Sequence, residues 1–127
     1  MPTVAFLDRF VRNLTASPDE IRAENLREWA RSVPDTTPLS DIQPRQRAKI
    51  AGVIQNIRID PRDGGSIEAT VCDGTGSLVA KWLGRSTLSG IRLAEGLVLE
   101  GAVGVGSDDL PMILNPEYQL VPGPEHG

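Results

Sequence analysis

The stretch SIEATVCDGTGSLVAKWL, residues 66–83, decides the fold. Apolar and polar residues alternate on both sides of a short DGTG segment, so each half is typical of a β-strand with one buried face. In the turn, Gly74 and Gly76 are free to adopt a left-handed backbone, and the Asp73 carboxylate can accept hydrogen bonds from turn N–H groups. A phosphate-binding loop would instead lead into a helix with a lysine, so the stretch predicts a β-hairpin and no nucleotide hydrolysis.

The alternation also assigns the two faces of this hairpin, because successive side chains of a strand point to opposite sides. One face is apolar and is expected to line the core, and it includes Trp82, for which core packing is therefore favoured: Ile67, Ala69, Val71, Leu78, Ala80 and Trp82. The other face combines polar and apolar residues around a lysine: Glu68, Thr70, Cys72, Val79, Lys81 and Leu83.

Three further segments have strand character: residues 47–59, 97–106 and 112–121. Residues 84–96 break the pattern and predict a loop or short helix between the third and fourth strands. Five short strands bury a core best by closing into a small barrel, which removes open edges. Gly52 and Gly101 lie inside the first and fourth strands, where a closed barrel needs tight bending. The sequence thus predicts a mainly β protein with a five-stranded barrel over residues 47–121.

The residues before the barrel are predicted to form two short amphipathic helices. An apolar stripe within residues 6–14 marks the first helix. Ser17, Pro18 and Glu20 form a capping box that begins the second, and Pro34 ends it. We therefore expect a helical segment at 1–33, a proline-rich linker at 34–46 and a disordered tail at 122–127.

Composition excludes several classes of protein. The chain has 127 residues, and its single cysteine, Cys72, excludes an intramolecular disulfide. No apolar run approaches the length of a membrane span, so a cytoplasmic protein without membrane contact is expected. The only histidine is His126, close to the end of the sequence, which leaves no catalytic dyad and no zinc site. We therefore expect no enzymatic activity and no cofactor.

The net charge of −4 hides an uneven distribution. Residues 41–85 carry seven basic and five acidic side chains, whereas residues 86–127 carry one basic and six acidic side chains. Local potential, not net charge, attracts a polyanion. The basic middle third fits either a nucleic-acid surface or an ordinary solvated surface.

Four segments carry a resemblance to a known family: RAKIAGVIQNI (47–57), EATVCDGTGSLVAKWLG (68–84), LAEGLVLEGAV (93–103) and MILNPEY (112–118). They resemble successive parts of OB-fold nucleic-acid-binding domains, in particular the wedge domain of RecG-type branched-DNA helicases and small actinobacterial OB-fold proteins. No helicase motor is present, so the resemblance does not imply that activity. It implies an OB barrel whose groove lies over strands two and three, flanked by the turns between strands one and two and strands four and five.

The groove implied by this resemblance would include four cations for phosphate contacts and two further side chains for contacts with bases: Arg58, Arg62, Lys81, Arg85, Val79 and Tyr118. Tyr118 fits either a groove contact or a barrel cap. The acidic turn at Asp108 and Asp109 would repel phosphate. The leading hypothesis is sequence-tolerant binding of single-stranded or branched DNA, with RNA as a further possibility. The alternative is a protein-interaction module, with a partner or a second copy bound by the apolar stripe of residues 6–14.

Overall fold

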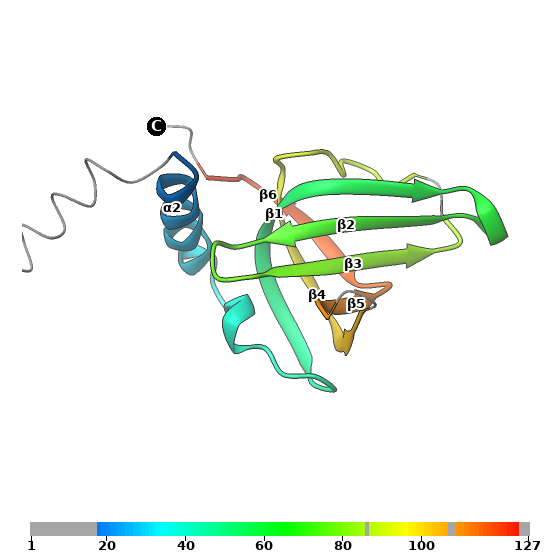
Figure 1. Cartoon of the computed structure of the whole chain (residues 1–127), viewed down its shortest axis with the longest axis horizontal. Helices are drawn as coiled ribbons and strands as arrows, with labels where there is room; N and C mark the ends of the chain where they lie inside the picture. Colours follow the sequence, from blue (N-terminus) through cyan, green and yellow to red (C-terminus); the bar gives the residue numbers. More distant parts are fainter. Residues whose placement is uncertain (1–17, 86, 107–108, 125–127) are drawn as a thin grey trace, which may run out of the picture.

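The computed structural model describes residues 18–85, 87–106 and 109–124, and this part of the chain is mainly β (Figure 1). Its one α-helix, α2, precedes all the strands, and two short 3₁₀ turns lie before and after the first strand. The elements are α2 (Pro18–Ser32), η1 (Leu39–Asp41), β1 (Arg47–Asp60), η2 (Arg62–Gly64), β2 (Ser66–Cys72), β3 (Ser77–Leu83), β4 (Gly96–Val105), β5 (Pro111–Leu114) and β6 (Glu117–Val121).

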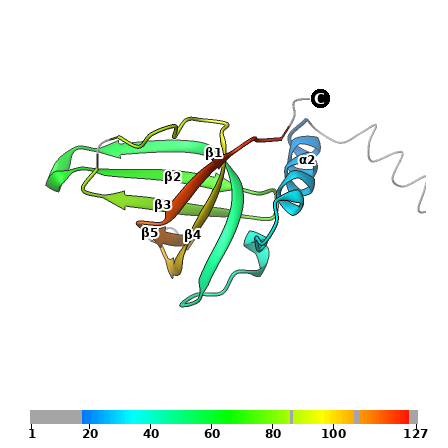
Figure 2. The same cartoon turned by 180° about the vertical axis from the view of Figure 1, so that it is seen from behind.

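Five of the strands form a closed ring, which confirms the predicted barrel. β1 pairs with β2, β2 with β3 and β4 with β1, all antiparallel. β5 closes the ring by pairing parallel to β3 and antiparallel to β4. β6 extends the sheet beside the first half of β4 (Figures 1 and 2). Between β3 and β4, the described residues 84–85 and 87–95 form no strand, as predicted for residues 84–96 apart from Gly96, which begins β4.

The long strand β1 belongs to two sides of the barrel. Residues 47–53 pair with β4, and residues 53–60 pair with β2, with an irregularity between Ile54 and Asn56. Gly52 lies at the change of partner, where a Cβ atom would overlap Cγ1 of Val71. Gly101 likewise leaves no room for a Cβ atom against Ile113. Both glycines therefore allow the close approach that a small barrel requires, as the sequence predicted.

The predicted fifth strand, residues 112–121, is instead divided into β5 and β6. Asn115 has a positive φ of 50°, and Pro116 has no N–H group to donate to a sheet. The break is tied to β3: the Asn115 N–H donates to the carbonyl of Lys81 at 2.6 Å, and its side-chain oxygen accepts from the N–H of Leu83 at 2.9 Å. The kink at Asn115 and Pro116 thus lets β5 pair with β3, while β6, which follows in the sequence, pairs with β4.

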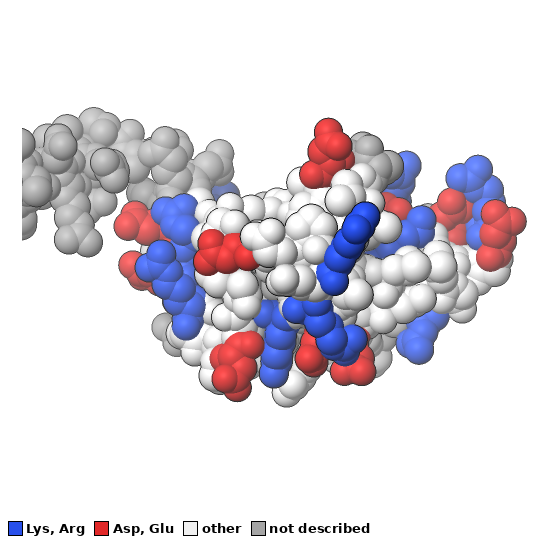
Figure 3. Space-filling view, turned by 90° about the horizontal axis from the view of Figure 1, so that it is seen from below, with Lys and Arg blue, Asp and Glu red and all other residues white. Residues whose placement is uncertain are grey.

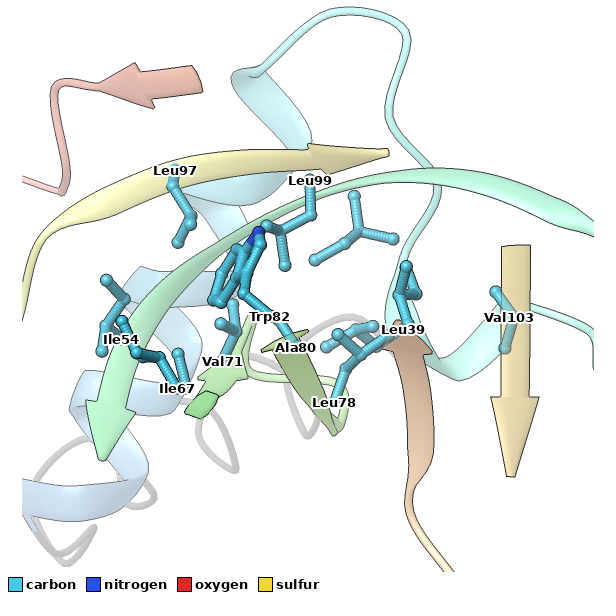
Figure 4. Close-up of a cluster of buried hydrophobic side chains, with 13 residues drawn as sticks. Leu39, Ile54, Ile67, Val71, Leu78, Ala80, Trp82, Leu97, Leu99 and Val103 are labelled. Carbon is cyan, nitrogen blue, oxygen red and sulfur yellow. The ribbon is translucent and has the colours of Figure 1, made fainter. Parts of the chain in front are cut away.

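The core fills the barrel with the side chains that the alternation assigned to it (Figure 4). Trp82 is 3% exposed and donates its indole N–H to the Pro116 carbonyl at 3.0 Å, which confirms core packing. Cys72 differs from its outward neighbours because it is buried. It lines a cleft together with Ala23 and Leu26 of α2.

The predicted second helix is α2, and the predicted helix at residues 6–14 lies outside the described residues. α2 packs on the turn between β2 and β3, where Arg27 donates to the carbonyl of Gly74 at 3.0 Å. The indole of Trp29 donates to the Pro122 carbonyl at 2.9 Å. Residues 34–46, predicted as a linker, contribute η1, from which Leu39 enters the core.

Candidate functional site

The outer surface of the hairpin and its two neighbours is the surface that the sequence predicted as a groove. We call it the hairpin face: the outward side chains of the second half of β1 and of β2, β3 and β5. The strand register sets these side chains in rows, each running from β1 towards β5. The rows are Asn56, Thr70, Val79 and Met112; then Arg58, Glu68, Lys81 and Leu114; then Asp60, Ser66 and Leu83.

The structure brings the four predicted cations to one end of the hairpin face, beside η2. Arg58 and Lys81 flank Glu68 in one row. Arg62 lies in η2 itself. Arg85 directly follows Gly84, whose N–H donates to the carbonyl of Gly65 at 2.8 Å. This hydrogen bond holds the end of β3 against the turn that follows β1, although 27 residues separate Arg58 from Arg85 in the sequence.

Two of these four cations already have acidic partners. Lys81 Nζ lies 3.4 Å from Glu68 Oε1. Arg62 donates from Nε and Nη2 to the two carboxylate oxygens of Asp60, each at 3.0 Å. The hydrogen bonds from the Arg62 side chain and backbone lower the pKa of Asp60 to about 2. These pairs leave less free positive charge at the hairpin face than the number of basic residues indicates.

Arg58 and Arg85 are exposed and make no hydrogen bond or ion pair within the described parts of the chain. They are therefore the two cations of the set that can bind an external anion without first losing an acidic partner. Elsewhere, basic and acidic side chains are interspersed, as the side of the molecule in Figure 3 shows. Free positive charge at the hairpin face thus depends on two arginines, Arg58 on β1 and Arg85 just after the end of β3.

The β3–β5 side of the hairpin face is aliphatic, and we call it the aliphatic strip: Val79, Leu83, Met112 and Leu114. Leu83 and Leu114 are each 49% exposed. Val79 is among the residues predicted from the sequence, whereas Met112 and Leu114 are not, although their alternation with the buried Ile113 indicates an outward position. No aromatic side chain of the described residues belongs to the hairpin face, so base stacking there would have no aromatic partner.

Tyr118 is the one predicted site residue that the structure does not bring to the hairpin face. It lies on β6, its ring centroid is 5.7 Å from that of Trp82, and the two rings meet edge to face at 75°. Its hydroxyl donates to the carbonyl of Ser89 at 3.1 Å. The sequence left open a groove contact or a barrel cap for Tyr118. This geometry corresponds to packing on the barrel and not to a contact on the hairpin face.

The turn between β4 and β5 includes the exposed Asp109, while Asp108 lies outside the described residues. Within residues 18–124, apart from the undescribed positions 86, 107 and 108, no group of three or more acidic, cysteine or histidine side chains is placed to hold a metal ion. Burial and the nearby Asp73 carboxylate raise the pKa of the Cys72 thiol, which disfavours its nucleophilic thiolate form. No helix in the described part of the chain is long and apolar enough to cross a membrane.

Comparison with known proteins supports the fold through structure alone. No family model and no curated protein matches the chain. A solved structure of the OBody AM3L09 bound to hen egg-white lysozyme superposes with a TM-score of 0.56 and 17% identity, over 72% of this chain and 99% of that chain. The replication factor A related protein from Methanobacterium thermoautotrophicum gives 0.56 and 14%, over 72% and 94%. The barrel is therefore an OB-fold barrel.

Proposed function

We propose that the chain is a non-enzymatic nucleic-acid-binding module that uses the hairpin face. The observation that carries the proposal is the free pair Arg58 and Arg85 at the end of the sheet next to η2, on the same face as the exposed aliphatic side chains of β3 and β5. Two guanidinium groups can contact successive phosphates, and the aliphatic strip can contact bases. Single-stranded DNA is the favoured ligand, because its bases are accessible to such a strip, and RNA shares the same chemistry.

Two similarities agree with this proposal, although the proposal does not depend on them. One of the structural neighbours is named as a replication factor A related protein. The sequence resemblance to the RecG-type wedge domain adds branched DNA to the candidate ligands. The acidic Asp109 and the absence of aromatic platforms both limit affinity, so we expect modest binding that depends on salt and tolerates many sequences.

The proposal is tested by titrating the protein into a labelled oligothymidylate at low and rising salt and measuring fluorescence anisotropy. We expect binding at low salt that weakens as salt rises. The double variant Arg58→Ala/Arg85→Ala should bind more weakly, and its slope of log K against log salt should fall by about 1.4, since each single-stranded phosphate contact contributes about 0.7. Parallel titrations of a Y-shaped junction and a plain duplex rank the DNA forms.

A matched control removes two charges from the opposite end of β1. Arg45 and Lys49 also lack ion pairs among the described residues, and Arg45 has a φ of 68°, which asparagine tolerates. The variant Arg45→Asn/Lys49→Gln should keep the wild-type salt slope. Absence of binding at low salt, or equal slopes for both double variants, would reject the hairpin face as a nucleic-acid site.

The aliphatic strip supports a second candidate, a protein-interaction module. Leu83 and Leu114 are half exposed beside a lysine that is already paired, and a structural neighbour is an OBody bound to lysozyme. Sizing of the full chain over a range of concentrations tests self-association. Loss of a dimer in Leu83→Ser/Leu114→Ser would assign it to the strip, whereas loss only after deletion of residues 1–16 would assign it to the apolar stripe.

A further inference from the structure

A second polar site lies at the other end of the hairpin, between α2, η1 and the turn that joins β2 and β3. It is a cleft of about 290 Å³, which we call the α2 cleft. In Figure 1, α2 and η2 lie at opposite ends of the β2–β3 hairpin, so the α2 cleft is separate from the four cations of the hairpin face. Its lining includes Arg27, Arg31, Thr37 and Asp41.

Two arginines of α2 contribute the positive charge of this cleft. Arg27 and Arg31 are four residues apart and so lie on the same side of the helix. Arg27 is half-buried, and its one hydrogen bond runs from Nη1 to the Gly74 carbonyl, which leaves most of its N–H donors free. Arg31 is exposed and makes no hydrogen bond or ion pair within the described residues. The pair therefore offers a large number of unused donors to one cleft.

Within the described residues, the acidic side chains of the same cleft form no ion pair with these arginines. Asp73 directs both carboxylate oxygens to other donors: the Leu39 N–H at 2.8 Å, and the N–H and hydroxyl of Thr75 and the N–H of Gly76 at 2.6–3.2 Å. Asp41 is exposed, and the one hydrogen bond that its carboxylate accepts comes from the Ser40 hydroxyl at 3.4 Å. The hydroxyl of Thr37, which also lines the cleft, has no partner among the described residues.

We propose that the α2 cleft binds the phosphate group of a phosphate monoester between Arg27, Arg31 and the Thr37 hydroxyl. Guanidinium groups match the oxygens of phosphate in geometry and charge, and a half-buried one loses little side-chain freedom on binding. The monoester is either a free mononucleotide or the phosphorylated end of a nucleic-acid strand. The second source rests on the proposed function, and the first does not.

Two features of the cleft oppose anion binding and make the proposal sharper. The negatively polarised end of α2 lies near Arg31, so this arginine would stabilise the helix end even if the cleft took no ligand. Asp41 and the buried Asp73 add negative charge to the lining. If a phosphate binds there, removing the charge of Asp41 must raise the phosphate affinity, whereas removing the charge of Arg31 must lower it.

The experiment is isothermal titration of the full chain with inorganic phosphate and with thymidine monophosphate, with thymidine as the uncharged control. We expect both phosphates to bind and thymidine not to bind. Arg31→Gln should weaken the affinity about tenfold or more, since a hydrogen bond to a charged group is lost. Asp41→Asn should tighten it, and Arg92→Gln, which removes a charge from the loop between β3 and β4, should leave it unchanged.

The two phosphate sources are separated by labelled oligonucleotides with and without a 5′ or 3′ phosphate. A gain in affinity from the terminal phosphate that disappears in Arg31→Gln identifies the strand end as the ligand, and no gain identifies the free monoester. Equal phosphate affinity in wild type and Arg31→Gln, no phosphate binding at millimolar concentration, or weaker binding in Asp41→Asn would each overturn the site. Failure of the oligonucleotides alone, with inorganic phosphate still bound, would count against the proposed function only.

Discussion

The two ends of the β2–β3 hairpin use an aspartate in opposite ways. At the end beneath α2, Asp73 is 2% exposed and accepts four hydrogen bonds, one of which ties η1 to the barrel. At the end beside η2, Asp60 pairs with the exposed Arg62 and joins no distant element. A buried carboxylate destabilises the fold unless protein groups donate hydrogen bonds to it. In an exposed ion pair, water can replace the partner of each charge at little cost in stability. The hydrogen bonds of Asp73 therefore hold η1 and the β2–β3 turn together at the first end, whereas the Asp60–Arg62 pair at the second end can open at little cost.

The largest effect is expected for Asp73→Ala. The substitution leaves the buried N–H of Leu39 without an acceptor and releases the Thr75 and Gly76 donors, which should cost about 3 kcal/mol of unfolding free energy. Urea denaturation measures the loss. The matched variant Asp60→Ala should change stability far less, as expected for an exposed pair. Equal losses in the two variants would remove the distinction between the two ends.

A smaller effect is expected from a pair of glycines with the same backbone conformation. Gly74 and Gly64 both have a φ of 85°, so alanine costs about 1–2 kcal/mol of backbone strain at either position. At Gly74 the added Cβ also overlaps the Ala23 carbonyl of α2, whereas at Gly64 no atom lies within 4 Å. Gly74→Ala should therefore lose more stability than Gly64→Ala, and only Gly74→Ala should lower the hydrogen-exchange protection of α2. Similar protection of α2 in both variants would show that this contact does not hold the helix.

The hairpin was predictable because its information is local. Alternation assigned each inward side chain of β2 and β3, and the turn residues fixed the position of Asp73. The second helix was predictable for the same reason, since its capping box and Pro34 lie at its two ends. Gly52 and Gly101 were recognised because few other residues tolerate a tight bend inside a strand.

The features that the sequence did not reveal depend on contacts between distant segments. The division of the last strand follows from Asn115 reaching back to Lys81 and Leu83 on β3. Cys72 lies at a cleft that residues of α2 also line, and Leu39 reaches the core from η1, where its N–H donates to Asp73. The pairing of Lys81 with Glu68 required the register of β2 and β3, which alternation alone does not give.

The smallest effect is expected at the η2 end and concerns pH. The Arg62 hydrogen bonds lower the pKa of Asp60 to about 2 in the folded chain, below the ordinary value of 3.8. A group whose folded pKa is lowered contributes stability above its unfolded pKa, and the contribution disappears as the pH falls through the folded pKa. The stability difference between wild type and Asp60→Asn should therefore be constant near neutral pH and shrink between about pH 4 and pH 2.

Carbon-detected NMR titration of the Asp60 carboxyl group measures this effect directly. We expect a midpoint near 2 in the wild type and a return towards 3.8 in Arg62→Gln, which removes the hydrogen bonds that cause the shift. High salt should move the wild-type midpoint upwards, because the pair is exposed and its charges are screened. An Asp60 midpoint that is the same in wild type and Arg62→Gln would mean that Arg62 is not held by Asp60. Arg62 would then join Arg58 and Arg85 as a third free cation, and the hairpin face would attract phosphate more strongly than the paired structure indicates.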